Sequence, residues 1–201
     1  MCGRYELFCS EENHEMNKII ELAVSNSSPD QHYNTTGEIF PSNAAPIIAV
    51  SSKRITPEFF VWGFPGFQKK ELIINARSET AAQKPTFKQA LIQRRCVVPS
   101  TGFYEWSHDS QKKKYKFNLP EQENLYMAGI WNEYDGQKHF VILTTAANRS
   151  MEPIHNRMPL ILPKEQIRSW INDTNMALSL LSQMPPELSV VNADPFEQLT
   201  L

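Results

Sequence analysis

The chain has 201 residues, a formal net charge of −2 and 41% hydrophobic residues. This length and composition predict one globular domain over residues 1–201 and exclude a collagen-like, coiled-coil or wholly disordered chain. Because a protein dedicated to duplex DNA is usually strongly basic, the slightly negative net charge indicates that any DNA contact comes from a local patch of cations.

Four segments have the apolar spacing of amphipathic helices. They are residues 11–26, 86–95, 164–172 and 175–184. The first carries Met16, Ile19 and Ala23 on one face, and Ser10 is its expected cap, with Asn13 nearby. Pro163 is suited to the start of the third helix.

Short apolar runs separated by turn residues predict β-strands. They cover residues 45–51, 55–63, 72–77, 96–99, 103–106, 115–119, 125–134, 139–146 and 188–192. Because these strands do not alternate with helices in regular βαβ units, the pattern predicts an α+β fold, with peripheral helices around a mixed or barrel-like sheet.

Membrane, metal and cofactor motifs are missing from the sequence. No apolar run approaches the roughly 20 residues of a membrane helix, and Arg4 and Glu6 occupy the place where a signal peptide is apolar. We therefore expect a cytoplasmic protein without membrane contacts. The three cysteines (Cys2, Cys9 and Cys96) have no C-x-x-C spacing, and neither histidine pairs nor glycine-rich motifs of the usual kinds occur. The sequence predicts no metal and no cofactor.

Cys2 could have an unusual reactivity because it follows the initiator methionine. Removal of Met1 would leave an α-amine of pKa about 7.7–8.0 beside a thiol of pKa about 8.5. Such a 1,2-aminothiol condenses with an aldehyde to an imine, and the thiol then closes a five-membered thiazolidine. Alternatively, the thiolate attacks a carbonyl with the α-amine as its base. From this position alone, the favoured interpretation is that Cys2 is simply the residue after the start codon.

Asn75 and Arg77 lie at alternate positions at the end of the apolar run 72–77, so they share one face of a strand. An asparagine can orient a reactive group, and an arginine can hold a phosphate through two hydrogen bonds. The alternative is an ordinary strand end that leads into a helix through Ser78 or Glu79.

Glu105 and His155 are the candidate proton carriers. Glu105 stands among Phe103, Tyr104 and Trp106, and burial among aromatic rings would favour a proton shuttle near neutral pH. His155 could protonate a leaving group while Arg157, two residues on, binds a phosphate. An edge-strand glutamate and a hydrogen-bonded turn histidine are the structural alternatives.

Two further segments are candidates for DNA contact. The aromatic loop 62–67 contains Trp62 and Phe67, which could stack on unpaired bases or close the core. The lysine run 112–114, with Lys116, is expected at a hairpin tip, either as a solvated turn or as a phosphate contact.

Five motifs occur in an order that resembles the SOS-response-associated peptidase (SRAP) family, also described as abasic-site processing proteins. They are Met-Cys-Gly-Arg-Tyr at 1–5, Trp-Gly at 62–63, Ile-Asn-Ala-Arg-Ser-Glu-Thr at 74–80, Gly-Phe-Tyr-Glu-Trp at 102–106 and Ile-His-Asn-Arg-Met-Pro at 154–159. The resemblance covers nearly the whole chain. It departs at residues 32–37, where the family's Arg-Tyr-Asn-x-x-Pro reads His-Tyr-Asn-Thr-Thr-Gly, although Asn34 still matches.

The resemblance implies a β-rich SRAP fold and covalent capture of abasic sites in single-stranded DNA as part of the DNA damage response. It implies that Cys2 is the nucleophile, that Asn75 orients it, and that Glu105 and His155 handle protons. The implied DNA contacts are Arg4, Asn34, Trp62, Phe67, Arg77 and Arg157. It further implies a weak lyase activity at the abasic site, removal of Met1 by the protein itself, and action as a monomer.

Two other functions stay open at this point. One is an N-terminal-nucleophile peptidase or amidohydrolase, in which serine could often replace Cys2. The other is a non-catalytic module that binds single-stranded DNA and does not depend on Cys2.

Overall fold

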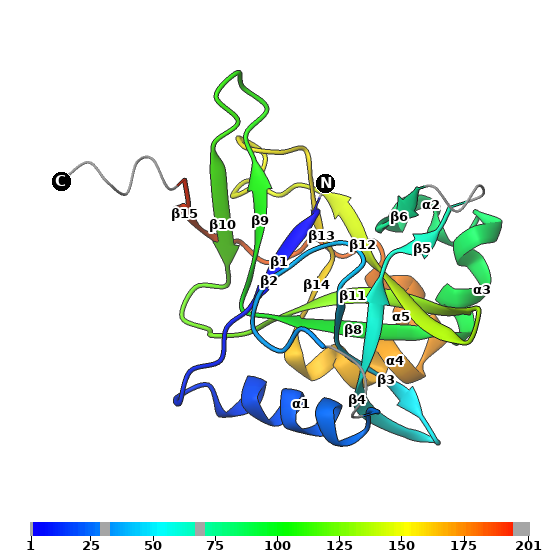
Figure 1. Ribbon diagram of the computed structural model, residues 1–201. Helices are drawn as coiled ribbons and strands as arrows, with labels where there is room; N and C mark the ends of the chain where they lie inside the picture. Colours follow the sequence, from blue (N-terminus) through cyan, green and yellow to red (C-terminus); the bar gives the residue numbers. More distant parts are fainter. Residues whose placement is uncertain (1, 29–32, 67–70, 195–201) are drawn as a thin grey trace.

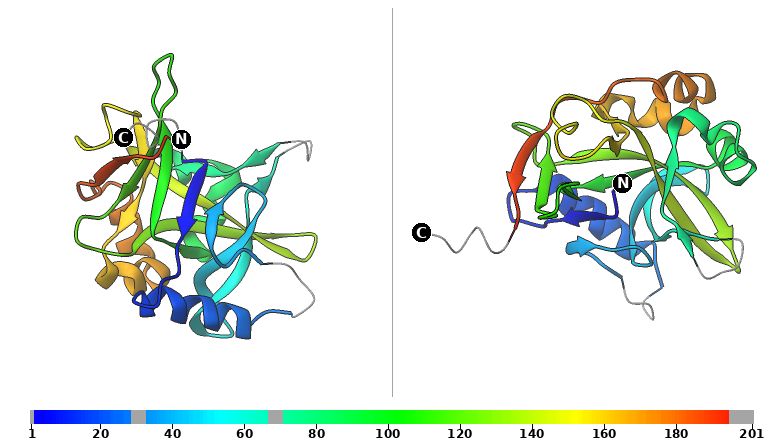
Figure 2. Two further views of the ribbon diagram at one scale, coloured as in Figure 1. Left: turned by 60° about the vertical axis from the view of Figure 1, so that its left-hand side comes forward. Right: turned by 90° about the horizontal axis from the view of Figure 1, so that it is seen from above.

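The computed structural model describes residues 2–28, 33–66 and 71–194 (Figures 1 and 2). Its centre is a closed β-barrel of five strands. In chain order these are β3 (Ala44–Ser51), β4 (Arg54–Trp62), β8 (Arg95–Ser100), β11 (Leu125–Tyr134) and β12 (Gln137–Ala146). The barrel closes because β12 pairs with β11 on one side and with β4 on the other.

Three short strands extend the barrel sheet. β7 (Asn75–Arg77) runs parallel to β12, β13 (Arg157–Pro159) runs antiparallel to β12, and β14 (Ile161–Leu162) runs antiparallel to β11. A separate small pair joins β5 (Phe64–Pro65) to β6 (Leu72–Ile73). β12 therefore brings β7 and β13, which lie far apart in the sequence, to the same end of the barrel.

A second, antiparallel sheet stands beside the barrel (Figure 1). Its order is β15 (Ser189–Asn192), β10 (Lys114–Asn118), β9 (Gly102–Trp106), β1 (Arg4–Leu7) and β2 (Gly37–Ile39). Tyr5 pairs with Phe103 in the register of β1 and β9, and both side chains are fully buried. The alternation of the strands thus directs one face of this sheet into the core.

The helices lie at the periphery, as Figure 1 shows. They are α1 (His14–Ser25), α2 (Ser78–Ala81), α3 (Pro85–Gln93), α4 (Ile167–Asn172) and α5 (Thr174–Leu180), with a 3₁₀ turn at Lys164–Gln166. α1 packs against β4 and β3. α4 packs against β8 and α5.

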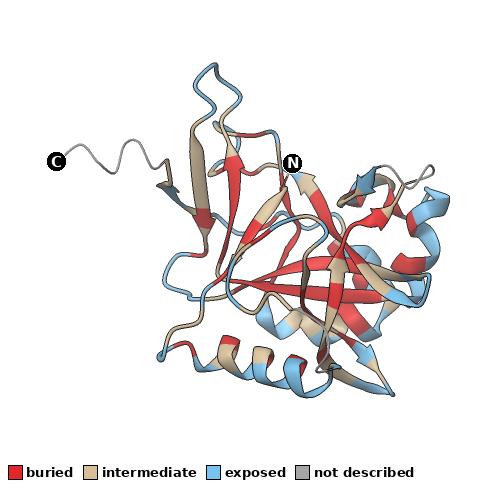
Figure 3. Ribbon diagram, in the orientation of Figure 1, coloured by how far each residue is buried: buried red, intermediate tan, exposed pale blue. Residues whose placement is uncertain are grey.

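The core has two parts, and Figure 3 shows that the buried residues concentrate in the barrel strands. One cluster, with Tyr5, Trp62 and Phe103, includes side chains from both the barrel and the second sheet. The other includes Phe87 of α3 and Trp170 of α4 with barrel residues. Cys2 belongs to the first cluster, so the core extends to the start of the described chain.

The structure confirms the expected α+β architecture with a barrel-like sheet and peripheral helices. The first helix begins later than expected, because the side chain of Asn13, and not that of Ser10, accepts the hydrogen bond from the Met16 N–H at 3.0 Å. The expected strand 72–77 is divided at Ile74 into β6 and β7. The second expected helix ends at Gln93, and Arg95 begins β8 instead.

Candidate active site and DNA interface

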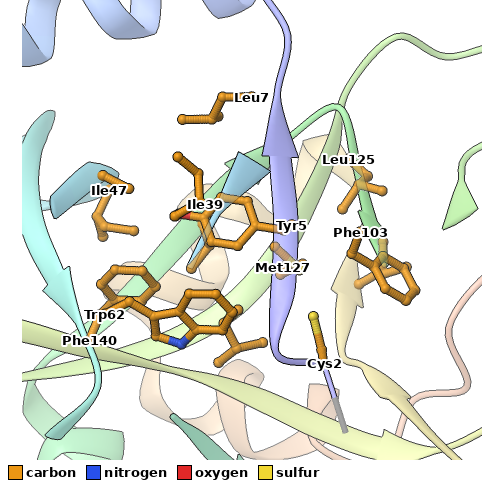
Figure 4. Close-up of a cluster of buried hydrophobic side chains, with 14 of the residues drawn as sticks. Cys2, Tyr5, Leu7, Ile39, Ile47, Trp62, Phe103, Leu125, Met127 and Phe140 are labelled. Atoms are coloured by element: carbon orange, nitrogen blue, oxygen red, sulfur yellow. The ribbon is translucent and has the colours of Figure 1, made fainter. Parts of the chain in front are cut away.

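Cys2 lies immediately before β1 and is fully buried. Figure 4 shows its side chain directed into the cluster that contains Phe103 and Met127. Sγ donates a weak hydrogen bond to the carbonyl oxygen of Arg4 at 3.8 Å. Burial, together with the negative charge of Glu105, raises the pKa of the Cys2 thiol well above its usual range. Cys2 is therefore a neutral thiol at physiological pH.

Asn75, the first residue of β7, contacts Cys2 directly. Its Nδ2 donates a hydrogen bond to the carbonyl oxygen of Cys2 at 2.8 Å. Its Oδ1 is buried and has no hydrogen-bond partner among the described residues. The β7 pairing with β12, which aligns Asn75 with Ile142, fixes the amide in this position. Asn75 thus has the geometry expected of a residue that orients the start of the chain.

Glu105 connects the cysteine electrostatically to the histidine. It lies in β9, is 6% exposed, and its charge acts on both Cys2 and His155. The carboxylate also accepts a hydrogen bond from the Trp106 N–H at 3.4 Å. The sequence left open an edge glutamate directed to water; its burial beside Cys2 and His155 supports the other interpretation.

His155 precedes β13 and is 7% exposed. Its Nδ1 accepts a hydrogen bond from the Arg157 N–H at 2.9 Å and lies 3.2 Å from the Arg157 carbonyl oxygen. The backbone of Arg157 can therefore donate its N–H to the neutral ring, and its carbonyl can accept a hydrogen bond from the protonated ring. Burial lowers the pKa of His155, while the negative charge of Glu105 opposes this shift.

The side chain of Arg157 is held by a carboxylate. Its guanidinium makes a bidentate contact with Glu79 of α2, with Nη2 3.0 Å from Oε2. Nη2 also donates to the carbonyl oxygen of Thr144 at 2.6 Å and lies 3.2 Å from its hydroxyl. The hydrogen bonds that Glu79 accepts from Arg157 hold the pKa of the Glu79 carboxyl below its usual range. Arg77, which pairs with Thr144 in the register of β7 and β12, is exposed nearby.

Arg4 lies on the opposite face of the second sheet from Glu105. Its guanidinium is 4.3 Å from the ring centre of Phe40 and 4.9 Å from that of Trp106, and it forms a salt bridge with Glu38 at 3.2 Å. Lys114 binds the same Glu38. Lys114 therefore belongs to an ion-pair network on the sheet, whereas Lys112 is exposed at the tip of the β9–β10 hairpin.

Asn34 and Trp62 lie in different environments. Asn34 is partly exposed, and its backbone N–H donates to the Ala44 carbonyl at 2.9 Å. Trp62 is fully buried, contacts the ring of Tyr5, and donates from its indole N–H to the Ile74 carbonyl at 3.0 Å. The burial supports the interpretation that Trp62 closes the core, and a ring in this position cannot stack on a base. Phe67 and His32 lie outside the described residues.

Sequence reasoning missed the contacts that hold these candidates. In the sequence, Glu79 is recognisable only as part of a strand end, and Thr144, Glu38 and His108 carry no functional signal. The 4.5 Å separation of the His108 and His155 rings joins residues 47 positions apart, and no local pattern in the sequence signals such a contact.

No group of three or more histidine, cysteine, aspartate or glutamate side chains among the described residues is arranged to hold a metal ion. In the same part of the chain, none of the helices has the length and apolar character needed to cross a membrane.

Comparison with known proteins places the chain in a family. The family model described as "SOS response associated peptidase (SRAP)" matches residues 1–195, and the chain belongs to this family. It is 34% identical over 211 aligned positions to the abasic site processing protein YoqW of Bacillus subtilis, covering 98% of this chain and 90% of that protein. It is 28% identical to the abasic site processing protein YedK of Escherichia coli, covering 85% and 79% of the two chains.

Solved structures share the fold. A protein from Bacteroides thetaiotaomicron matches with a TM-score of 0.77 at 24% identity, covering 96% of this chain and 93% of that one. A protein from Bordetella bronchiseptica matches with a TM-score of 0.76 at 22% identity, covering 96% and 100%. The barrel with its companion sheet is therefore the SRAP fold.

Proposed function

We propose that this protein captures abasic sites in single-stranded DNA by a covalent bond to Cys2, after removal of Met1. The observation that carries the proposal is the convergence on Cys2 of an amide and a carboxylate from distant segments. Asn75 binds the Cys2 carbonyl at 2.8 Å, and the charge of Glu105 acts on the Cys2 thiol and on His155. The names of relatives such as YoqW and YedK, which are abasic site processing proteins, support the same substrate.

The chemistry begins at the α-amine of Cys2. The amine attacks the aldehyde carbon of the ring-opened deoxyribose, and loss of one water gives an imine. Sγ then adds to the imine carbon, and the thiol proton moves to nitrogen, which closes the thiazolidine. No electrons are gained or lost overall. A thiol that is neutral at physiological pH suits this order, because the amine forms the first bond and the thiol reacts only with the imine.

Two of the buried groups have the properties that the proton transfers require. The abasic sugar is mostly a closed hemiacetal, so its ring opening needs a group that takes the hydroxyl proton and returns one to the ring oxygen. Glu105, buried next to Cys2, is our candidate for this step. His155 is our candidate for protonating the hydroxyl that leaves as water, since Arg157 can hydrogen-bond to either protonation state of its ring.

Lyase activity follows from the same intermediate. If Sγ does not capture the imine, loss of a proton from the adjacent carbon expels the 3′ phosphate by β-elimination. We therefore propose a weak abasic-site lyase activity, together with hydrolysis of the Met1–Cys2 peptide bond by the protein itself. All four candidate catalytic side chains belong to one chain, which supports action as a monomer.

The DNA interface that we propose consists of Arg4, Asn34, Arg77 and Arg157. Arg77 and Arg157 flank Thr144 near the end of β12, and a phosphate there would compete with Glu79 for the Arg157 guanidinium. Phe67 remains a candidate wedge from the sequence alone. Single-stranded DNA is the substrate that we favour, because an abasic sugar in it can reach a buried cysteine without the opening of a duplex. The few available cations of the chain also fit a substrate that is held by a small number of phosphates.

A peptidase is the less favoured alternative. Nucleophilic cysteines of hydrolases usually lie in electropositive surroundings that lower the thiol pKa. Here burial and Glu105 raise the pKa of the Cys2 thiol. This environment disfavours a thiolate and favours a reaction that starts at the amine.

The test uses protein whose mass verifies the absence of Met1. It is mixed with single-stranded DNA that bears one abasic site, and the products are separated on a denaturing gel after heating. We expect a heat-stable band of reduced mobility, which is lost with Cys2→Ala, with Cys2→Ser, and with a tetrahydrofuran analogue that has no aldehyde. If verified protein gives no such band, the covalent-capture proposal is wrong; a peptide-hydrolysing activity that survives Cys2→Ser would favour the alternative.

A further inference from the structure

A second imidazole lies against the candidate proton carrier. The rings of His108 and His155 are 4.5 Å apart between centres and inclined by 32°. His155 is buried, whereas His108 is exposed on the hairpin between β9 and β10. His108 thus covers His155 from the solvent side, and the exposed ring is in contact with the buried one.

The hairpin loop is built to keep His108 in this place. On either side of it, the Asp109 carboxylate accepts hydrogen bonds from the Ser107 hydroxyl at 2.7 Å and from the Gln111 N–H at 3.1 Å. The Ser107 backbone N–H donates to the Lys113 carbonyl at 3.0 Å, and the Ser107 hydroxyl accepts from the Lys113 N–H at 2.9 Å. These bonds close the loop across its base and restrain the backbone that carries His108.

The charges around His155 determine how the contact with His108 affects the protonation of His155. Glu105 of β9 favours the protonated ring, whereas His108 and the positive charge of the chain's amino group disfavour it. Arg157, two residues further along, contacts Nδ1 through its backbone. Two imidazoles in contact resist double protonation, because like charges at this distance repel. The state of His108 therefore influences whether His155 holds a proton.

We propose that His108 is a positioning residue that acts through His155: the charge of its imidazole, held against the buried ring, sets the protonation of His155. Nothing in the covalent reaction requires His108 to touch the substrate. Its assigned role rests on the proposed function of His155 as the proton donor to the departing water. His155 gives its proton to the departing hydroxyl and regains one when the nitrogen loses its proton to form the imine. The reaction therefore needs a protonated His155 at the outset, and this is the state that His108 influences.

The test separates ring contact from charge with two variants. His108→Gln removes both the ring and the charge, whereas His108→Phe keeps an aromatic ring over His155 without a charge. The protonation midpoint of His155 is measured by NMR titration of its ring in the DNA-free protein. We expect both variants to raise this midpoint by roughly half a pH unit or more. Each variant removes a like charge from a ring whose centre lies 4.5 Å from that of His155.

His14→Gln is the matched control, because His14 is exposed on α1, away from the site. It should leave the His155 midpoint unchanged. An unchanged midpoint in both His108 variants would overturn the proposal, and so would a change in His108→Gln alone, since that result would assign the effect to packing.

The second measurement is the pH dependence of crosslinking to single-stranded DNA with an abasic site. Its alkaline limb, where His155 loses the proton that it must donate, should move to higher pH by the same amount in both variants. If the wild-type protein forms no crosslink, the proposed function fails, while the NMR titration still decides whether the two histidines are coupled. If the midpoint moves but the alkaline limb does not, the assigned role of His108 in the reaction is overturned.

Discussion

The candidate catalytic residues are each oriented by a backbone contact. Asn75 donates to the Cys2 carbonyl, and His155 receives the Arg157 N–H. These contacts fix the direction of the Asn75 amide and of the His155 ring. Holding reacting groups in place before the substrate arrives is one of the larger sources of rate enhancement in enzymes.

Asn75→Asp should slow crosslinking. The substitution replaces the Nδ2 donor by an oxygen against the Cys2 carbonyl, so it removes a hydrogen bond and adds a repulsive contact. We expect a loss of about 5- to 100-fold in the rate, as for a lost hydrogen bond of about 1–3 kcal/mol. Single-turnover crosslinking measures this rate, with the exposed Asn175→Ala on α5 as the control. A rate equal to that of the control would show that Asn75 does not orient Cys2.

His155 gives the stability a pH dependence with a defined sign. Burial lowers its pKa in the folded state, so the unfolded chain binds the proton more readily. Stability should therefore fall as the pH decreases below the unperturbed value of about 6.5. Urea unfolding at about pH 7.5 and about pH 5.5, on either side of this value, should show a smaller fall for His155→Gln than for the wild type. An equal fall would contradict the assigned environment of His155.

At the residue scale the sequence indicates candidate residues but not the environment of each. Cys2, Asn75, Glu105 and His155 were all singled out from their residue types and their motifs. Trp62 shows the limit of this reasoning: an aromatic residue at the end of a strand, before a glycine, is compatible with both core and surface. Only its contact with Tyr5 and its hydrogen bond to Ile74 decide for the core.

Among the secondary-structure elements, the long and strongly apolar ones were predictable. The strand predicted at 125–134 is found as β11 (Leu125–Tyr134). β1 (Arg4–Leu7) and β2 (Gly37–Ile39) were not predicted. Both strands are short and carry charged residues on their outer face, so their alternation is weak in the sequence. They are stabilised by pairing with each other and with β9, which is a tertiary effect.

Two helix ends depend on one buried cation. Arg95 is 5% exposed and donates to the carbonyls of Leu91 and Ile92 near the end of α3, and to those of Trp170 and Ile171 in α4. The last carbonyls of a helix have no partner within it and carry partial negative charge. Arg95 therefore joins α3 and α4 to the barrel through its guanidinium.

Arg95→Met should destabilise the fold without altering the chemistry of the site. It keeps much of the side-chain volume but leaves buried carbonyls without donors, so we expect a loss of about 2–5 kcal/mol in the free energy of unfolding. Urea denaturation measures the loss, and crosslinking of the folded fraction should be unchanged. A variant as stable as the wild type would show that the four hydrogen bonds contribute no net stability.

At the scale of the whole molecule, charge limits the interaction with DNA. The net charge is −2, and carboxylates already neutralise two of the arginines proposed to contact phosphates, Arg4 through Glu38 and Arg157 through Glu79. A phosphate must therefore displace a carboxylate to bind either of them. The affinity for DNA should therefore come from the lesion and from a few local phosphates.

The salt dependence of binding to single-stranded DNA should consequently be weak. Each phosphate contact contributes a slope of about −0.7 to the dependence of log K on log salt concentration, so the three arginines limit the slope to about −2. Fluorescence anisotropy with Cys2→Ala, which cannot crosslink, measures the slope. Arg77→Ala should reduce it by about 0.7. A much steeper slope would require a basic surface that we have not assigned.

The most direct test of the central claim is the chemical state of Cys2 in the crosslinked product. The complex is formed with single-stranded DNA that carries one abasic site, treated with borohydride and iodoacetamide under denaturing conditions, digested, and analysed by mass spectrometry. We predict an N-terminal peptide that begins at Cys2, carries the sugar with the loss of one water, gains no hydrogens from borohydride, and is not alkylated. A peptide that is reduced by borohydride and alkylated at Cys2 would show an imine with a free thiol, and would contradict the thiazolidine mechanism.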